Sequence, residues 1–317
     1  MFIRSMGALA ACLAFAATAQ EFPQRPIRII VPWGPATPPD LAVRLLTNQL
    51  AQGLGQPVVV ENRAGAGGTV GLMEFIRAAP DGHTLMTFGP AQALTPVLYP
   101  KTPVDLKREL APVVLLESFD NVLVVGSGSA LKTVAELVAA LRAKPGMTFA
   151  SGGNGTPAHM SGELFNQMSG LRNTHVPYNV FPQAIGDVIA GRVDFMFLAA
   201  PAAVPQVRGG KLRALAVTGT KRVLGIEEIA PVREQGYPDF VVSSWDSLVT
   251  HAAAPVAAIA RINAEVNKAL ATAQVREGLA KIAAEPIGGS AADLGALIHL
   301  NIDRWGDVAR KAGVKAD

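Results

Sequence analysis

Residues 147–168, MTFASGGNGTPAHMSGELFNQM, decide the fold of this chain. They read as a short apolar strand over 147–150, a glycine-rich loop over 151–157 and a helix over 158–168. A strand that leads through a tight loop into a helix is the repeating unit of parallel α/β sheets. This stretch therefore predicts a parallel sheet that is covered by helices.

The same order of strand, loop and helix recurs along the chain. Residues 28–31 are a β-branched run stopped by Pro32, and a periodic apolar set follows over 41–50. The capping box Thr133 to Glu136 begins a helix. Further strands are predicted at 58–60, 84–88, 113–116, 122–125, 175–178, 193–197 and 213–218, and further helices over 69–79, from 255 and over 294–305. Two α/β halves are visible in this pattern.

The first residues have the form of a secretory leader. Arg4 precedes an apolar run, and Ala17-Thr18-Ala19 supplies small residues for cleavage. We expect residues 1–19 to be a signal peptide and the mature protein to lie in the periplasm. A second interpretation is a lipoprotein box that ends at Cys12, where an acyl anchor would attach. The apolar run continues past Cys12, which favours cleavage and soluble export.

Composition excludes several functional classes. Beyond the leader, no stretch reaches the roughly 18 apolar residues of a membrane-spanning helix. The chain has 28 Lys and Arg against 25 Asp and Glu, so nucleic acid is not an expected partner. Cys12 is the only cysteine, and the five histidines lack metal-ligand spacing. Val70 stands where a nucleotide fingerprint needs its third glycine. We predict no cofactor and no metal.

The loop over 152–156 is a candidate anion site. Free N–H groups and the positive end of the helix dipole gather between a strand and a helix, and glycines let the backbone approach a ligand. A tight surface turn is the alternative interpretation. Ser151, His159 and Ser161 do not form a nucleophilic set, because helical spacing places His159 and Ser161 about 200° apart.

Several ordered motifs together resemble one known family. They are PIRIIVP at 26–32, GQPVVVENRAGAGG at 55–68, PDG at 80–82, HVPY at 175–178, GKLRALAVT at 210–218, RINAEVNKAL at 261–270 and EPIGGS at 285–290. From about Pro23 to its end, the chain resembles the Bug family of extracytoplasmic receptors of tripartite tricarboxylate transporters.

The resemblance implies an α/β fold of type II, a Venus flytrap of two lobes joined by crossing strands. Lobe 1 would comprise residues 20–119 and 247–317, and lobe 2 residues 120–246. One loop from each lobe would hold a small carboxylate through backbone N–H groups and bridging waters. Membrane transporter subunits are the implied partners, the chain is expected to be a monomer, and its role would be uptake and not catalysis.

In lobe 1 the expected ligand-binding residues are Trp33, Gly34, Pro35, Ala36, Asp40, Gly89 and Ala91. Pro38 and Pro39 replace a glycine and a threonine of the family's loop, so two backbone donors are lost. One interpretation is an altered carboxylate site. The other is an ordinary first helical turn, in which prolines and a capping Asp40 keep the loop in shape.

In lobe 2 the expected ligand-binding residues are Ser151, Gly153, Asn154, Gly155, Thr156, Tyr178, Phe181 and Leu198. Leu198 and Ala199 stand where members that bind amino-dicarboxylates have Asp-Asn, which disfavours an amino-acid ligand. Phe181 either borders the pocket or packs between helices. Trp33, Phe181 and Leu198 together suggest a less polar acid, of which an aromatic acid is one example.

Two other functional classes stay open beside the transport receptor. A sensory protein could use the same lobes to bind a ligand and then contact a membrane partner. A hydrolase or transferase of small acids would need a convergent nucleophile, base and acid, which the sequence does not assemble.

Overall fold

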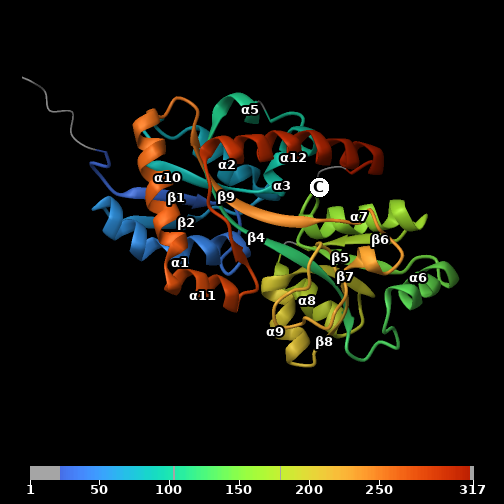
Figure 1. Ribbon diagram of the computed structural model, residues 1–317. Helices are drawn as coiled ribbons and strands as arrows, with labels where there is room; N and C mark the ends of the chain where they lie inside the picture. The colour runs from blue at the N-terminus through green and yellow to red at the C-terminus, as the bar shows by residue number, and fades with distance from the viewer. Residues whose placement is uncertain (1–21, 103, 179, 315–317) are drawn as a thin grey trace, which may run out of the picture.

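The computed structural model describes residues 22–102, 104–178 and 180–314, and in them two lobes share one sheet (Figure 1). The sheet has ten strands, eight of them in the order β2-β1-β3-β9-β4-β7-β5-β6, while β8 and β10 also pair with β4. The leader and Cys12 lie outside the described residues. The two-lobed α/β fold expected from the sequence is confirmed.

Lobe 1 is a parallel sheet with helices on it. Its strands are β1 (Ile27–Val31), β2 (Val58–Asn62) and β3 (Thr84–Phe88), and its longer helices are α1 (Pro38–Leu54), α2 (Thr69–Ile76), α10 (Val256–Ala271) and α11 (Ala273–Lys281). β1 lies between β2 and β3, with Ile29 opposite Val60 and Leu85. Short elements complete the lobe: η1 (Ala66–Gly68), α3 (Pro90–Ala93), α4 (Thr95–Leu98), α5 (Leu106–Glu109) and β10 (Glu285–Pro286).

Lobe 2 repeats this organisation. Its elements are α6 (Val134–Ala143), β5 (Thr148–Ser151), α7 (Pro157–Ser169), β6 (Thr174–Pro177), α8 (Phe181–Ile189), β7 (Phe195–Ala199), α9 (Ala200–Arg208), β8 (Leu212–Val217) and η2 (Val232–Glu234). Thr133 caps α6 by accepting from Glu136 N, but the Glu136 carboxylate accepts from Lys132 N. The predicted capping residues are therefore confirmed, with the return bond shifted by one residue.

Two crossing strands join the lobes. β4 (Leu110–Gly126) is one continuous strand where the sequence suggested two, and β9 (Ser243–His251) runs antiparallel to it. Their pairing extends from Leu110 and His251 to Asp120 and Ser243, with register shifts along the way. In lobe 1, β9 also pairs with β3, whereas in lobe 2, β4 pairs with β7 and β8.

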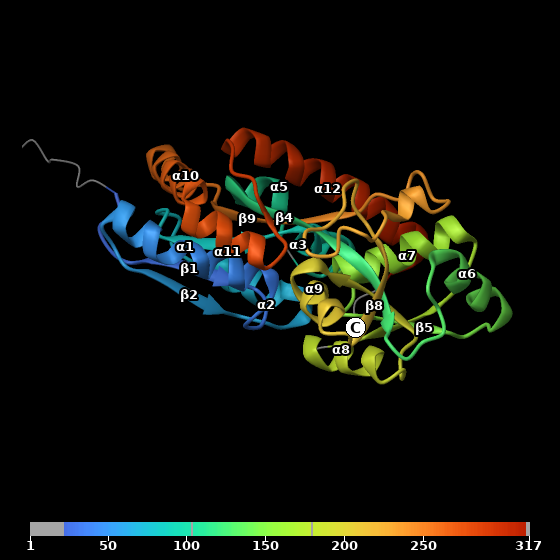
Figure 2. The same ribbon diagram turned by 60° about the horizontal axis from the view of Figure 1, so that its bottom comes forward.

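The C-terminal helix α12 (Ala291–Ala312) spans both lobes. Leu294 and Ile298 in its first half belong to the lobe 1 core. Trp305 and Ala309 in its second half belong to a core that is mostly lobe 2. Figure 2 shows α12 running from above α5 towards α7. The last helix was predicted to belong to lobe 1, and only the first half of α12 packs there. The lobe boundaries given by residue number stay predictions.

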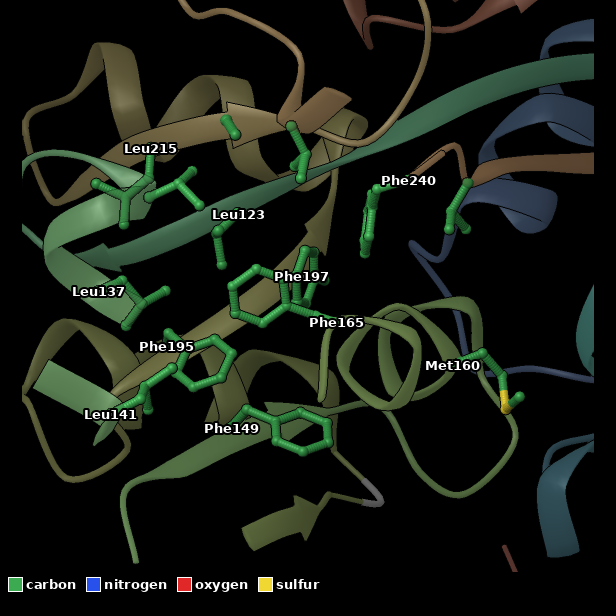
Figure 3. Packing of buried hydrophobic residues seen from close by; sticks show 14 of the residues in the cluster. Leu123, Leu137, Leu141, Phe149, Met160, Phe165, Phe195, Phe197, Leu215 and Phe240 are labelled. Atoms are coloured by element: carbon green, nitrogen blue, oxygen red, sulfur yellow. The ribbon is translucent and has the colours of Figure 1, made fainter. Parts of the chain in front are cut away.

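Aromatic rings fill the core of lobe 2 under α7. Phe165, on α7, contacts Phe195 and Phe197 edge to face, and Phe149 stacks on Phe195 at a centroid separation of 5.7 Å (Figure 3). Edge-to-face and offset arrangements are those that the quadrupoles of aromatic rings favour. This packing fixes α7, and with it the loop that precedes α7.

Candidate functional site

The candidate site lies where the two lobes touch. Pro90 and Leu94 of lobe 1 and Gly155, Pro157 and Met160 of lobe 2 line a narrow cavity of about 10 Å³, together with Val242, Ser243 and Trp305. A methyl group added to Gly155 would overlap Leu98 of α4. The loop before α7 therefore packs closely against lobe 1.

In lobe 1, the loop between β1 and α1 is held from inside by Asp40. Asp40 is 2 % exposed, and its side chain accepts from Ala36 N, Arg44 Nε and Asn62 Nδ2, each at 2.9 Å. Ala36 has φ 61, in the left-handed region that an alanine rarely occupies. The carboxylate of Asp40 thus fixes a strained turn, because its bond to Ala36 N holds that residue in place.

The other predicted residues of this loop differ in exposure. Pro35 and Ala36 are exposed, Gly34 is half-buried, and Trp33 is half-buried against the lobe 1 core. Pro38 and Pro39 are the first two residues of α1. In the described part of the chain, the residues of this first loop do not line the cavity between the lobes.

A second loop of lobe 1 does reach that cavity. Gly89 N donates to Gln92 Oε1 at 3.0 Å, a bond that caps the short helix α3. Ala91 is buried, and its neighbour Pro90 lines the cavity instead. The sequence placed ligand contacts in this loop, but the residue that faces lobe 2 is Pro90.

In lobe 2, the predicted glycine loop is closed by its own side chains. Thr156 Oγ1 donates to Gly153 O at 2.8 Å, and Gly153 N donates to Ser151 Oγ at 3.1 Å. Gly155 N donates to His159 Nδ1 at 3.1 Å, while Asn154 is half-buried between them. The loop is therefore preorganised, and its N–H groups at 153 and 155 are engaged internally.

A pair of stacked histidines supports this loop, and the sequence did not reveal it. The rings of His159 and His175 lie 3.7 Å apart at 6°, and Ser151 Oγ is 2.6 Å from His175 Nε2. Burial, with a contribution from the neighbouring His159, lowers the pKa of His175 to about 3. His175 is therefore neutral near pH 7. The position of His175 in the HVPY motif was the one available signal.

The remaining predicted residues of lobe 2 are Tyr178, which follows β6, Phe181, the first residue of α8, and Leu198, in β7. Tyr178 OH donates to Asp187 Oδ2 at 2.5 Å, and burial, followed by this hydrogen bond, raises the pKa of Tyr178. Phe181 is half-buried, packs on the lobe 2 core and lies against Gly152 of the glycine loop. Leu198 is fully buried in that core, so its side chain does not face the cleft.

Residues 22–102, 104–178 and 180–314 contain no group of three or more His, Cys, Asp or Glu that could hold a metal ion. Over the same ranges, no helix is both long and apolar enough to cross a membrane.

Two lobes, crossing strands and preorganised loops that meet between them define a two-lobed solute-binding protein. Residues 42–314 match the family described as tripartite tricarboxylate transporter family receptor. The chain therefore belongs to that family. The protein BugT of Bordetella pertussis is 33% identical over 96% of this chain and 94% of its own length. The resemblance to the Bug family is thereby confirmed.

Two solved structures with bound acids are similar to this chain. MatC (Rpa3494) from Rhodopseudomonas palustris with bound malate is 30% identical, with a TM-score of 0.84 over 90% of this chain and 99% of its own. R. palustris Rpa4515 with adipate is 29% identical, with a TM-score of 0.87 over 93% of this chain and 99% of its own.

Proposed function

We propose that this chain is a periplasmic receptor that binds a small carboxylate between its lobes and delivers it to the membrane subunits of a tripartite transporter. The observation that carries the proposal is the pair of capped loops before α3 and α7, which come from opposite lobes and meet across a cavity of about 10 Å³. A cavity of that size holds about one water molecule, so the lobes must separate to admit an acid. Relatives of the same fold that hold malate and adipate support a carboxylate as the ligand class.

Hydrogen bonds alone are sufficient for this task, but the N–H groups of Gly89, Gly153 and Gly155 are engaged within their own loops, so the ligand's donors are other groups or bridging waters. Three or four charge-assisted hydrogen bonds of roughly 1.5 to 3 kcal/mol each, less the cost of association, reach the approximately −8 kcal/mol of a micromolar complex. The N-terminus of α7 adds a favourable dipole for an anion. A receptor needs no side-chain cation under these conditions.

The ligand that suits the site is less polar than malate. Phe181 is half-buried against the glycine loop, and Trp33, two residues after β1, is half-buried on the lobe 1 core, so the part of each ring that stays exposed is aromatic surface for a ligand. Prolines at 38 and 39 remove donors that a second carboxylate would use. We propose an aromatic or long-chain acid, bound by a cleaved, exported monomer.

A binding role also accounts better for the Ser151 and His175 contact than catalysis does. The separation of 2.6 Å is that of a nucleophile and its base. Yet Ser151 is fully buried, and no carboxylate among the described residues bonds to the His175 ring. The contact stabilises the glycine loop, so we propose that the protein is not an enzyme.

Calorimetry with malate, adipate and benzoate tests this function. We expect binding of at least one acid without turnover, and Phe181→Ala should weaken binding of an aromatic acid by about 5- to 30-fold, the loss of roughly 1 to 2 kcal/mol of ring contact. Val180→Ala, at an exposed neighbour, is the control and should change little. Absence of heat with every acid, or product formation from any, would contradict the proposal.

A further inference from the structure

Two acids face each other on the crossing strands. Glu117 of β4 is the register partner of Asp246 of β9, next to a register shift in the ladder. Glu117 is 0 % exposed and Asp246 is 7 % exposed. Directly opposed residues of an antiparallel pair place their Cβ atoms about 4.5 to 5.5 Å apart. Two carboxyl groups are therefore buried side by side between the lobes.

In the part of the chain that the structure describes, neither acid has a partner that would stabilise a charge. Both Glu117 oxygens and Asp246 Oδ2 are buried without a hydrogen bond in the described part of the chain. Ser244 Oγ, two residues from Asp246 and so on the same face of β9, is buried and unpartnered as well. An ionised carboxylate in such a place is costly, whereas a protonated carboxyl can donate to its neighbour.

No cation compensates the pair within the described residues. Across residues 22–102, 104–178 and 180–314, neither Glu117 nor Asp246 takes part in an ion pair. Several charged groups on the surrounding elements have other partners: Asp40 with Arg44 on α1, Glu265 with Arg261 and Lys268 on α10, Lys107 on α5 with Asp303 on α12, Asp187 on α8 with Arg192, Arg213 on β8 with backbone carbonyls, and Asp120 on β4 with Ser243. Arg208 on α9 and His299 on α12 are further titratable groups on helices that pack against β4. Glu285 on β10 is exposed and adds further negative charge beside β4.

The pair is adjacent to the candidate site. A methyl group added to Gly89 would lie 3.2 Å from Asp246 Oδ1 and 2.8 Å from Trp245 O. Gly89 begins the loop whose Pro90 lines the cavity between the lobes. A negative charge on Asp246 would therefore stand next to the place where an anionic ligand is expected.

We propose that Glu117 and Asp246 form a proton-binding site at the junction of the lobes, and that a carboxylate ligand binds most tightly when this site holds both of its protons. The second half of this proposal rests on the proposed function. The ligand's own charge favours the protonated pair, so binding above neutral pH takes up a proton.

The direction of the pKa shifts agrees with this geometry. Burial raises the pKa of Asp246 to about 7, and burial together with the Asp246 charge raises the pKa of Glu117 well above its usual range. When folding raises the pKa of an acid, proton binding favours the folded state. This contribution to stability is complete at pH values below the acid's pKa in the unfolded chain. That contribution is lost as the pH rises from about 4 through about 7.

Thermal unfolding between pH 4 and pH 8 tests the proton site without any ligand. Asp246→Asn keeps the shape of the protonated acid but cannot ionise. The Tm of the variant minus that of the wild type should therefore increase as the pH rises through this window. Asp239→Asn, at an exposed acid, is the control and should keep a constant difference from the wild type. Glu117→Gln provides a second neutral variant. A constant difference for both Asp246→Asn and Glu117→Gln would overturn the proton site.

Titration of adipate and benzoate at pH 6 to 9 tests the coupling. Wild-type affinity should fall by up to tenfold per pH unit above about 7, and the affinity of Asp246→Asn, in which only Glu117 still titrates, should fall less steeply. Wild-type affinity that is independent of pH would overturn the coupling while leaving the receptor function intact. If no acid binds at any pH, the proposed function fails, and the unfolding series still decides the proton site.

Discussion

At the scale of single residues, the candidate site depends on backbone positions that few side chains tolerate. Ala36 is held at φ 61 by the Asp40 carboxylate, and Gly153 and Gly155 have φ 114 and 75. Strained positions persist only where the surroundings determine them. The loops are therefore fixed before any ligand arrives, which lowers the entropy cost of binding.

Gly155 and Gly153 allow a matched test of the contact between the lobes. Alanine costs about 1 to 2 kcal/mol at either position, because each glycine has left-handed φ. A methyl group at Gly155 would also overlap Leu98. A methyl group at Gly153 would have no atom within 4 Å. We expect the free energy of urea unfolding to fall further for Gly155→Ala than for Gly153→Ala. Equal losses would mean that the lobes do not touch here in solution.

At the scale of elements, two glycines inside helices differ in how closely they are packed. Gly162 of α7 stands over the Phe149 ring, and a methyl group there would overlap it. Gly186 of α8 has nothing within 4 Å. The first glycine is therefore required by packing, whereas the second only weakens its helix.

Alanine at these two positions should have opposite effects. Gly162→Ala overfills the core of lobe 2 and should cost about 1 to 3 kcal/mol of unfolding free energy. Gly186→Ala should gain about 0.5 to 1 kcal/mol, because alanine loses less backbone entropy in a helix. Urea denaturation followed by circular dichroism measures both. A stabilised Gly162→Ala variant would contradict the packing described for α7.

Elements with a clear apolar period could be predicted from the sequence, whereas of the crossing strands β4 was predicted only as two pieces and β9 was not predicted. Ser244, Asp246, Ser247 and Thr250 are buried along β9, so this strand has no apolar alternation to recognise. β4 was divided into two strands because Glu117, Ser118 and Asp120 interrupt its apolar run. Burial of polar side chains at the junction of the lobes hides these strands from sequence patterns.

The loops of the candidate site could be predicted from the sequence, whereas the contacts that hold these loops could not. These loops follow strands and contain glycine or proline, and local signals of this kind are readable. The contacts of His159 with His175 and of Asp40 with Asn62 join residues that are distant in sequence, and these depend on the tertiary fold. Leu198 was expected at the cleft, but the sequence could not distinguish it from a core residue.

At the scale of the whole molecule, α12 couples the lobes. Trp305 is 4 % exposed, packs in the core of lobe 2 and donates from Nε1 to Asn301 Oδ1 at 3.0 Å. The first half of the same helix packs on lobe 1. Any change in the angle between the lobes must therefore move Trp305 or bend the helix.

Trp305→Ala should loosen this coupling. Removing a buried tryptophan costs about 3 to 5 kcal/mol. We expect a lower urea midpoint and a larger radius of gyration by X-ray scattering, because one connection between the lobes is lost. Leu300→Ala, on the exposed face of α12, is the control and should change neither quantity. An unchanged radius for Trp305→Ala would show that the crossing strands alone set the lobe angle.

The crossing strands also determine the order in which the molecule can be assembled. Strand β3 pairs with β9, so the sheet of lobe 1 cannot be completed until residues 243–251 have joined it. All of the intervening lobe 2 lies between these two segments. Closing so long a loop is slow unless the loop has already become compact. Folding from an unfolded chain should thus begin in lobe 2. Lobe 1 should be completed last, when β9 and the helices that follow it join β3.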